Sequence, residues 1–553
     1  MKEGGRLYTI LRVLLLAAAV FAAYANSLDG QFIFDDSRIY NNQHIRITSL
    51  DWDSLSQAAL ASKPVTRPVA NLSFALNYYL HGYNVQGYHL VNVCIHLLTG
   101  LLLYLLLVAT MQTPAFCNLD KRAGDERLPY EWLAFLAALL WLVHPLQTQS
   151  VSYVVQRMNS MAAMFYLASM LCYVRARLHG ARVGKLVLSA ASVGCGLLAL
   201  GCKETSATLP VFVFLYEWYF MQDLDMGWLK RRLPVLALVA GLSAGAAVLF
   251  LGWQPLDSIL ASYGGRDFTL PQRLLTEMRV IFLYLSLLIF PHPSRLTLDH
   301  DLLLSTSLVQ PITTLFAAAG LIAMVGAAVW SGRRHRLLSF AILWFLGNLI
   351  IESSFIALEI VFEHRLYLPA MFLFFVAVVG AYRLLHPRFI KMGLAVAVVL
   401  AVLLGFWTFE RNKVWHDPIS LWSDSVAKAP NKARPRNNLG VALKKAGYLR
   451  EAAEQYQAVI ALDPNFIEAY VNLGNIYQAE SRLDEALAMY YKAMDLNGGY
   501  AVIHKCIGEI MLKQGKYSRA TMYFSEAVRL QPDDAEARSS LQYAQWMWRR
   551  FKR

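Results

Sequence analysis

The sequence predicts an all-α membrane protein: a polytopic bundle of about eleven membrane-spanning helices followed by an α-solenoid of short helical repeats. Three observations support this prediction. Hydrophobic residues make up 57% of the 553 residues and charged residues only 16%, which is too apolar for a water-soluble enzyme. Long uncharged runs recur as far as Phe409. From Ala433 onward, small and aromatic residues recur at a constant period of 34 residues.

The formal net charge of +13 raises the question of nucleic-acid binding. The Lys and Arg residues lie mostly in short loops between the apolar runs, where membrane insertion and anionic lipid select them. We therefore expect membrane lipid as a partner and no nucleic acid. The six cysteines are scattered over apolar segments and the C-terminal region, so neither a disulfide framework nor a metal site follows from them.

The first apolar run, residues 7–25, follows a short basic segment and lacks a small-x-small cleavage pattern, so we expect a retained first span. A polar and aromatic loop follows, up to about residue 84. Further spans are expected at residues 87–110, 132–145, 158–174, 186–201, 209–221, 233–252, 312–330, 337–351, 366–382 and 392–409.

The apolar segment at residues 280–290 decides the topology. It has about 11 residues, against the roughly 20 that a straight span needs. If it crossed the membrane, Arg333, Arg334 and Arg336 would face outward. If it is re-entrant or interfacial, every short Lys/Arg-rich loop stays cytoplasmic. We favour the second arrangement, which leaves the C-terminal repeats on the non-cytoplasmic side.

The repeats have the pattern of tetratricopeptide repeats (TPRs). The recurring positions are Leu439-Gly440, Leu473-Gly474 and Ile507-Gly508, then Ala452, Ala486 and Ala520, and then Tyr456, Tyr490 and Phe524. Small residues where two helices cross, followed by an aromatic residue, are typical of this repeat. We therefore expect a membrane domain at 1–412, a linker with a degenerate half-repeat at 413–432, three TPRs at 433–534, and a capping helix with a basic, aromatic end at 535–553.

Four polar clusters fall at the outer ends of the expected spans. They are Asp35 with Asp36, residues 144–149 with Arg157, Lys203 with Glu204, and Glu363-His364-Arg365. Ionisable residues at membrane depth are expensive and indicate function. A carboxylate near several cations suits attack by a hydroxyl on a lipid-phosphate-linked sugar. The carboxylate would act as general base, and Arg and Lys would hold the phosphate leaving group.

Each cluster also has a structural interpretation. The two aspartates could cap a loop helix, and the arginines could be interfacial anchors. Lys203 and Glu204 could form a local ion pair, and His144 could simply end a helix. His89, Asn92 and His96 share one helix face, where interhelical hydrogen bonds are a better explanation than metal ligation.

Several segments resemble the GT-C membrane glycosyltransferases that end in TPRs, whose animal members are the transmembrane TPR-containing O-mannosyltransferases and which have bacterial relatives. In chain order these segments are Phe34-Asp35-Asp36, RPVANLSFALNY, GYHLVNVCIHLL, HPLQTQSVSYVVQRMNSMA, KETSATLPV and FEHRLYLP. The resemblance implies a GT-C fold, a polyprenyl- or dolichyl-phosphate sugar donor and inversion at the anomeric carbon. It also implies that an aspartate of the first outer loop is the base, which falls on Asp35 or Asp36, and we favour Asp35.

The resemblance places Arg157 and Arg365 at or next to the arginines of that family. Two positions depart from it, because Gln149 and Asn159 stand where the family often has Glu and Asp. An acid or ligand role at these two positions is therefore in doubt. The expected site residues are Asp35 and Asp36 for catalysis, Arg157, Lys203 and Arg365 for the donor phosphate, and His89, His144, Glu204 and His364 as further candidates. Arg and Lys can meet a monophosphate leaving group alone, so we expect no obligatory metal, with a divalent metal as the alternative.

The TPR array should bind a protein acceptor or partner through the face lined by the first helix of each repeat. The residues expected there are Asn437, Lys444, Asn475, Gln478 and Lys505.

The sequence thus predicts a glycosyltransferase that acts on an acceptor hydroxyl, in the first place on protein Ser or Thr. It would lie in a bacterial inner membrane with periplasmic TPRs, or alternatively in the endoplasmic reticulum membrane with lumenal TPRs. Two other functions compete with this prediction. One is a non-enzymatic TPR scaffold for envelope assembly or export, and the other is a lipid-linked sugar transporter.

Overall fold

The computed structural model describes residues 2–116, 129–251, 255–386 and 388–551, and every regular element in these ranges is a helix, as the sequence predicts. The chain divides into two compact units. The first comprises Met1–Leu298 and Leu302–Asp417, and the second comprises Asp299–Asp301 and Pro418–Arg553. Each unit is described separately below.

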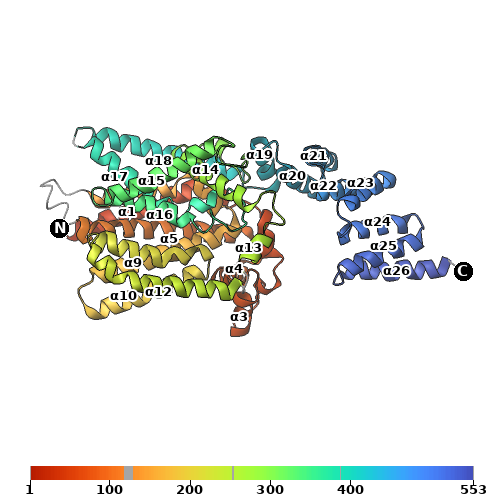
Figure 1. Cartoon of the computed structure of the whole chain (residues 1–553), viewed down its shortest axis with the longest axis horizontal. Helices are drawn as coiled ribbons and strands as arrows, with labels where there is room; N and C mark the ends of the chain where they lie inside the picture. The colour runs from red at the N-terminus through yellow and green to blue at the C-terminus, as the bar shows by residue number, and fades with distance from the viewer. Residues whose placement is uncertain (1, 117–128, 252–254, 387, 552–553) are drawn as a thin grey trace. The chain divides into compact units, whose positions relative to one another are not determined.

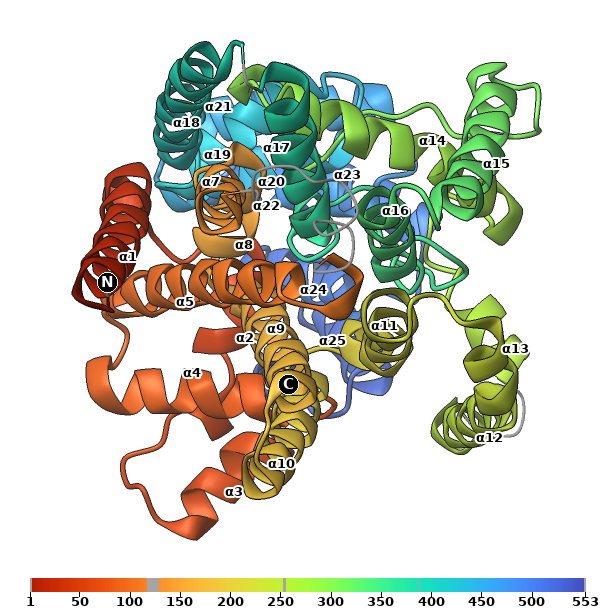
Figure 2. The same ribbon diagram turned by 90° about the vertical axis from the view of Figure 1, so that its left-hand side faces the viewer.

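The first unit is a bundle of long helices that lie side by side in Figure 1. Its α-helices are α1 (Lys2–Tyr24), α2 (Ser37–Tyr40), α3 (Trp52–Leu60), α4 (Pro68–His81), α5 (Val85–Met111), α7 (Tyr130–Leu142), α8 (Thr148–Val151), α9 (Arg157–Leu178), α10 (Arg182–Leu200), α11 (Leu209–Tyr216), α12 (Met226–Leu251), α13 (Pro255–Ala261), α14 (Leu270–Ile289), α15 (Thr313–Ser331), α16 (Arg336–Leu349), α17 (Met371–Leu385) and α18 (Ile390–Lys413). Figure 2 looks along the bundle and places α1, α12 and α15 at its periphery.

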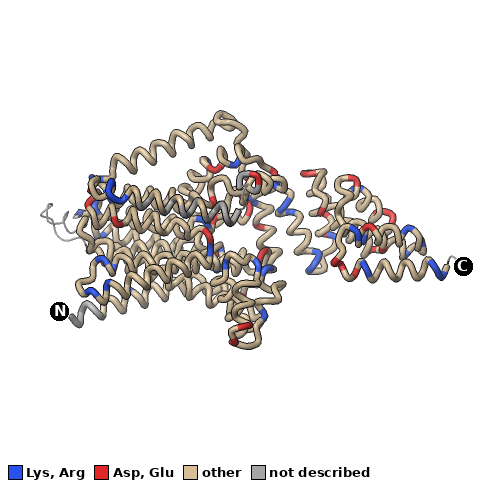
Figure 3. The backbone as a smooth tube through the Cα atoms, turned by 60° about the horizontal axis from the view of Figure 1, so that its bottom comes forward, with Lys and Arg blue, Asp and Glu red and all other residues tan. Residues whose placement is uncertain are grey.

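Five helices in the described ranges are long and apolar enough to cross a membrane: α1, α5, α10, α15 and α18. Shorter apolar helices, α7, α16 and α17, lie among them. Figure 3 shows Lys and Arg recurring at the end of the bundle where the chain begins. This is the distribution expected at the cytoplasmic face of a multi-pass membrane protein.

Helix α14 differs from the prediction at its start. We expected an apolar segment at 280–290, whereas the helix begins ten residues earlier, at Leu270. Thr269 and Gln272 form a capping box there, which satisfies the first free N–H groups of the helix. Both ends of α14 contact loops at the same end of the bundle. Arg273 donates to the carbonyl of Ser354, just after α16, and the carbonyl of Leu288 lies 3.2 Å from His144 Nε2, just after α7.

The second unit is a solenoid of helix pairs. Its helices are α19 (Pro418–Lys428), α20 (Ala433–Lys445), α21 (Leu449–Leu462), α22 (Ile467–Ala479), α23 (Leu483–Leu496), α24 (Ala501–Lys513), α25 (Tyr517–Leu530) and α26 (Ala535–Phe551). Helix α19 packs against α20, at the position where we expected half of a degenerate repeat. The segment Asp299–Asp301 belongs to this unit, because Asp299 pairs with Lys432 and Arg434 at 2.8 and 2.6 Å.

The recurring glycines explain the repeat pattern. A Cβ on Gly474 would lie 2.6 Å from the ring of Tyr490, so only glycine lets the two helices of this repeat approach so closely. Gly440 meets Tyr456 in the same way, and Gly508 meets Phe524. In each repeat, the glycine of the Leu-Gly or Ile-Gly pair therefore packs against the aromatic residue 16 positions later.

Candidate active site

The two adjacent aspartates lie in a tight 3₁₀ turn, η2 (Phe34–Asp36), and the structure gives them different environments. Asp36 is 1% exposed, and both of its carboxylate oxygens accept backbone hydrogen bonds. Oδ2 accepts from the N–H of Ile33 at 2.8 Å, and Oδ1 accepts from the N–H of Val155 at 2.7 Å. Asp36 therefore ties this turn to η5 (Val154–Gln156), far along the chain.

The turn carries backbone strain at one residue. Phe34 has a φ of +52°, a left-handed conformation that costs a non-glycine residue free energy.

Burial raises the pKa of Asp36 to about 8, although the N–H groups of Ile33 and Val155 act in the other direction. Through these two backbone contacts the side chain of Asp36 holds the turn in place.

Asp35 points toward solvent instead. Its side chain is 38% exposed and forms an ion pair with Arg38 at 3.4 Å. Its backbone N–H donates to the hydroxyl of Tyr153 at 2.9 Å, and the Tyr153 ring stacks on Trp415. The carboxylate of Asp35 is thus the accessible member of the pair, held on a turn that is fixed on both sides.

Arg157 opens α9 and is completely buried. Its Nε donates to Asn92 Oδ1 and its Nη2 donates to Asn77 Oδ1, each at 2.7 Å, and Nη2 also donates to the carbonyl of Tyr88. The guanidinium also lies 4.7 Å from the ring centre of Phe74. These contacts join α9 to α4 and α5. A phosphate-binding role for Arg157 stays a prediction.

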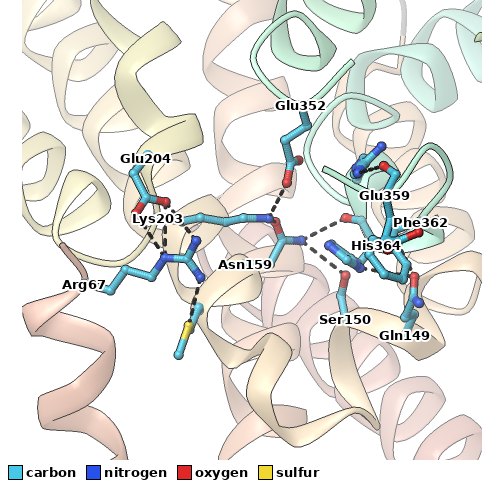
Figure 4. Close-up of polar contacts among 12 residues, drawn as sticks. Arg67, Gln149, Ser150, Asn159, Lys203, Glu204, Glu352, Glu359, Phe362 and His364 are labelled. Carbon is cyan, nitrogen blue, oxygen red and sulfur yellow. Dashed lines mark hydrogen bonds and ion pairs between the residues drawn. The ribbon is translucent and has the colours of Figure 1, made fainter. Parts of the chain in front are cut away.

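Lys203 forms the centre of a buried charged cluster, shown in Figure 4. Its Nζ lies 2.8 Å from Glu352 Oε1 and donates to Asn159 Oδ1 at 3.0 Å. Both charged side chains are at least 90% buried. Burial, partly offset by Glu352, lowers the pKa of Lys203 below its usual range. Although burial acts to raise the pKa of Glu352, the charge of Lys203 leaves it lower than usual.

Arg365 joins the same cluster from η9 (Glu363–Leu366). It is 3% exposed, and its guanidinium donates to the backbone carbonyls of Ile360 and Glu359. It also lies 3.7 Å from Glu277 of α14, which pairs with Arg273 at 2.9 Å. The Nε of Arg365 is buried without a hydrogen-bond partner.

His364 lies beside this arginine and faces Gln149. Its backbone N–H donates to Gln149 Oε1 at 2.7 Å, and its Nδ1 lies 3.2 Å from the same oxygen. Burial, with the nearby charges of Lys203 and Arg365, lowers the pKa of His364 well below its usual range. The ring is therefore neutral and does not add to the positive charge of the cluster.

Glu204 is the exposed edge of the cluster. Its carboxylate accepts from Arg67 Nε through both oxygens, at 3.1 and 3.2 Å, and from the Thr66 hydroxyl at 2.5 Å. Its side chain is about half exposed. The ion pair with Arg67 shows that Glu204 does not pair with its sequence neighbour Lys203, which was the structural alternative.

Three other buried histidines, His89, His96 and His144, contact neighbouring segments of the bundle. His144 Nε2 lies 3.2 Å from the carbonyl of Leu288, and its Nδ1 caps η4 (Pro145–Gln147). His96 lies 2.8 Å from the Tyr367 hydroxyl and 2.9 Å from the carbonyl of Leu142, which is the hydrogen bonding expected of this residue, whereas the ring nitrogens of His89 are buried without a hydrogen-bond partner. His89 is 1% exposed and packs so closely on Gly30 that a Cβ there would lie 3.0 Å from its Nε2.

One short segment, residues 149–159, contains part of one of the four clusters and contacts the other three. Gln149 holds His364, and Tyr153 and Val155 hold the aspartate turn. Asn159 donates to the carbonyl of His364 and accepts from Lys203. The structure therefore brings together the residues that the sequence placed at separate span ends.

The cluster around Lys203 has an excess of positive charge. Three cations, Lys203, Arg273 and Arg365, face two carboxylates, Glu277 and Glu352, and all five side chains are at least 90% buried. An uncompensated buried cation is costly unless an anion binds beside it. Phosphate oxygens, which accept charge-assisted hydrogen bonds, are suited to this position.

Several of these partners were not predicted. These partners are Arg67, Arg273, Glu277 and Glu352. Their long-range contacts join residues 79–149 positions apart, and Arg273 and Glu277 lie on a helix whose start was placed too late. Two signals were present. Arg273 and Glu277 are spaced four apart in an apolar helix, and Glu352 directly follows an apolar span, as the predicted clusters do. In the described ranges, no group of three or more His, Cys, Asp and Glu side chains could hold a metal ion.

The residues expected on the TPR face make hydrogen bonds within the repeat unit. Asn437 Oδ1 accepts from Asn472, whose own Oδ1 accepts from Lys444. Tyr490 donates its hydroxyl toward Asn475 Oδ1 at 2.8 Å and Gln478 Oε1 at 2.9 Å. Lys505 differs from the others, because it pairs with Glu536 at 2.7 Å. Polar side chains of the first helices are thus hydrogen-bonded between and within repeats.

Comparison with known proteins agrees with both units. Residues 445–481 match the family described as TPR repeat, and residues 467–500 match the family described as Tetratricopeptide repeat. Protein O-mannosyl-transferase Tmtc3 of Drosophila melanogaster is 26% identical over 88% of this chain and 59% of its own length. Protein O-mannosyl-transferase F38B6.6 of Caenorhabditis elegans is 26% identical over 84% and 64%, and human Protein O-mannosyl-transferase TMTC1 is 27% identical over 84% and 56%.

The chain is similar to the TPR-containing O-mannosyltransferases over most of its length. This confirms the resemblance that the sequence motifs indicated. The chain spans about 56–64% of the length of these relatives. Among solved structures, the crystal structure of the APC/C hetero-tetramer Cut9-Hcn1 covers 89% of this chain at 16% identity with a TM-score of 0.25, which is too low to support an argument.

Proposed function

We propose that this chain is a membrane glycosyltransferase that transfers one sugar from a polyprenyl-phosphate donor to a hydroxyl of a protein acceptor. The relatives named above suggest mannose as the sugar and protein Ser or Thr as the acceptor. The observation that carries the proposal is the segment 149–159, which joins an accessible carboxylate to a buried cluster with excess positive charge.

Asp35 is the general base in this proposal. Its carboxylate removes the proton of the acceptor hydroxyl as the oxygen attacks the anomeric carbon. The new carbon–oxygen bond forms as the bond between the anomeric carbon and the phosphate oxygen breaks, on the opposite face of the sugar. The configuration is therefore inverted, and polyprenyl phosphate leaves with the bonding electron pair. The proton on Asp35 is then released to water.

Lys203 and Arg365 receive the donor phosphate. Negative charge grows on the bridging oxygen as the bond breaks, and preorganised cations in a site of low dielectric constant stabilise this charge strongly. Glu352 and Asn159 hold Lys203 in place, and the carbonyls of Glu359 and Ile360 hold Arg365. Because these cations alone meet a monophosphate, we propose a mechanism without an obligatory metal.

The topology that fits this chemistry has about eleven crossings of a GT-C-type bundle, with α14 not crossing. Both ends of α14 contact loops at the same end of the bundle, which supports this arrangement. The catalytic groups and the TPRs then lie on the non-cytoplasmic side. We propose a bacterial inner membrane with periplasmic TPRs, and an endoplasmic reticulum membrane with lumenal TPRs is the alternative.

Transfer of radiolabelled mannose from polyprenyl-phosphate mannose to an acceptor peptide, with the purified chain in lipid nanodiscs, tests the proposal. Asp35→Asn should reduce transfer by about 10²–10⁴-fold, the usual contribution of a general base. Full transfer by Asp35→Asn would exclude Asp35 as the base. Movement of donor across a bilayer without glycosylated product would instead support a transporter.

A further inference from the structure

The last helix of the second unit, α26, packs against the repeats with its first half and is basic and aromatic at its end. Ala537 and Ala544 are buried, and α26 lies along α25. Near the end of α26, the ring of Phe551 stacks on Tyr517, the first residue of α25, with 5.2 Å between the ring centres. This stacking brings the end of α26 next to the turn between α24 and α25.

Two stretches of chain without acidic residues meet at this place. Residues 510–525 contain three basic residues, residues 541–553 contain four, and neither stretch contains Asp or Glu. Five of these cations lie in the described ranges and are exposed, and together we name them the basic end of the TPR unit: Lys513, Lys516, Arg519, Arg549 and Arg550. Figure 3 shows the last two next to the C-terminus.

The charge of the basic end is not compensated within the described part of the chain. None of its five cations forms an ion pair there, whereas Arg529, on the same helix as Arg519, pairs with Glu526 at 2.5 Å. Lys516 has a hydrogen bond to the neutral side chain of Gln514. The surface is therefore suited to a partner that carries several negative charges.

Aromatic rings lie on the outward face of the same helix. Tyr543 and Trp546 are each 52% exposed, and their ring centres are 6.1 Å apart. The guanidinium of Arg550 lies 5.2 Å from the ring centre of Trp546. Trp and Tyr rings have an apolar body and a polar edge and are enriched where a membrane meets water. Exposed tryptophan beside uncompensated arginines is the composition of a helix that binds at a lipid surface.

An anionic lipid surface matches both properties of this end of the unit. Its negative surface potential attracts nearby Lys and Arg side chains, and its boundary between headgroups and acyl chains takes up aromatic rings. Phe551 is 64% exposed although one face of its ring stacks on Tyr517. Together with Trp546 it offers apolar area that a purely ionic partner in water would leave uncovered.

We propose that the basic end of the TPR unit binds the surface of an anionic phospholipid bilayer, with its five cations at the headgroup phosphates and with Trp546 and Phe551 at the acyl-chain boundary. This inference goes beyond the proposed function and does not depend on sugar transfer. It gives the C-terminal end of the chain an attachment to lipid in addition to the apolar helices of the first unit.

An environment-sensitive label on α26 tests this inference. Gln542 is exposed about one turn before Trp546, so Gln542→Cys, in a background without native cysteines, can carry a nitrobenzoxadiazole group. The full chain in nanodiscs of neutral phosphatidylcholine is titrated with vesicles of phosphatidylcholine alone or with about 30 mol% phosphatidylglycerol. Anionic vesicles should shift the emission to shorter wavelength, at a midpoint lipid concentration at least about tenfold lower than neutral vesicles require.

Two sets of variants separate charge from aromatic contact. Arg549→Gln with Arg550→Gln should raise the midpoint about tenfold, because each removed cation weakens the attraction to the surface. Trp546→Gln keeps every charge and should also raise it about tenfold, because the ring is lost from the boundary. The matched control, Lys445→Gln with Lys492→Gln, removes two exposed cations elsewhere in the unit and should leave the midpoint unchanged.

The inference would be overturned by any of four results: no emission shift with anionic vesicles, equal midpoints for the two kinds of vesicle, equal effects of the two double variants, or an unchanged midpoint in Trp546→Gln. The titration contains no sugar donor. Failure here would therefore leave the proposed transfer reaction untouched, and failure of the transfer assay would leave lipid binding untouched.

Discussion

At the scale of the residue, Asp35 and Asp36 show that neighbouring acidic side chains can have very different environments. Both carboxyl oxygens of Asp36 accept hydrogen bonds, from the N–H groups of Ile33 and Val155. The carboxylate of Asp35 lies at the surface. Asparagine at position 36 would turn one acceptor into an NH₂ group that faces a backbone N–H. That leaves a buried donor unsatisfied, which costs about 1–3 kcal/mol.

We therefore expect Asp36→Asn to lower the thermal unfolding midpoint of the detergent-solubilised protein, and Asp35→Asn to leave it nearly unchanged. Intrinsic tryptophan fluorescence follows the unfolding, because Trp415 stacks on Tyr153 next to this turn. An equal midpoint for Asp36→Asn and wild type would show that the two backbone hydrogen bonds contribute little.

The high pKa of Asp36 predicts a dependence of stability on pH. The folded protein keeps this proton up to a pKa of about 8, whereas the unfolded chain releases it near the ordinary value of 3.8. The folded state thus binds more protons between these values, and stability falls as the pH rises toward 8. Midpoints measured between pH 5 and pH 8.5 should decrease more in wild type than in Asp36→Asn. A parallel decrease in the two proteins would contradict this explanation.

The ion pair of Lys203 and Glu352 is suited to a double-mutant cycle. Glu352→Gln leaves the buried ammonium with amide partners alone and should destabilise the protein by about 3–5 kcal/mol. Lys203→Met with Glu352→Leu removes both charges and should recover much of the loss. The double variant should nevertheless fail to use donor, because the phosphate ligand is gone. Full donor use by the double variant would exclude Lys203 as a phosphate ligand.

The sequence indicated several residues of the candidate site but not their contacts. Charges at the ends of apolar runs pointed to Asp35, Lys203 and Arg365, because charge at membrane depth is rare without function. The pairing of these groups depends on contacts between distant segments, such as Lys203 with Glu352. No local spacing encodes such contacts.

At the scale of the element, the start of a helix and the contacts within a repeat are determined by residues that lie close together in the sequence. The sequence contains the capping-box residues Thr269 and Gln272. The first turns of α14 also contain the charged residues Arg273 and Glu277, so this part of the helix is not an apolar run and was not predicted. The TPR period was correctly predicted because the residues that define it contact each other within a single repeat, as Gly474 and Tyr490 do.

Gly474→Ala tests that contact. The added methyl group would meet the Tyr490 ring at 2.6 Å, and relief of this overpacking should cost about 1–3 kcal/mol. The TPR unit should then be cut faster by trypsin under native conditions. Gly498→Ala is the control, since a Cβ there would meet its nearest atom, the Met494 carbonyl oxygen, at an ordinary 3.6 Å. Equal cleavage rates for the two variants would contradict the packing explanation.

At the scale of the whole molecule, the number of crossings determines on which side each end of the bundle lies. Cys506 is a poor reporter of topology because it is 7% exposed. Two exposed positions serve better, Lys492 in the TPR unit and Arg334 in the loop after α15. In a background without native cysteines, a membrane-impermeant maleimide should label Lys492→Cys in intact bacteria whose outer membrane is permeable to it. Arg334→Cys should be labelled only after lysis, and the opposite pattern would mean that α14 crosses.

The way in which residues 149–159 hold the aspartate turn has a consequence for how such chains can diverge. The position of Asp35 is set by Tyr153 and Val155 and not by the loop that follows it. Changes in length or sequence at about residues 48–61, which are not part of these contacts, should therefore leave Asp35 in place relative to Lys203 and Arg365. Under the proposed function, this stretch can diverge while the groups proposed for the chemistry keep their arrangement.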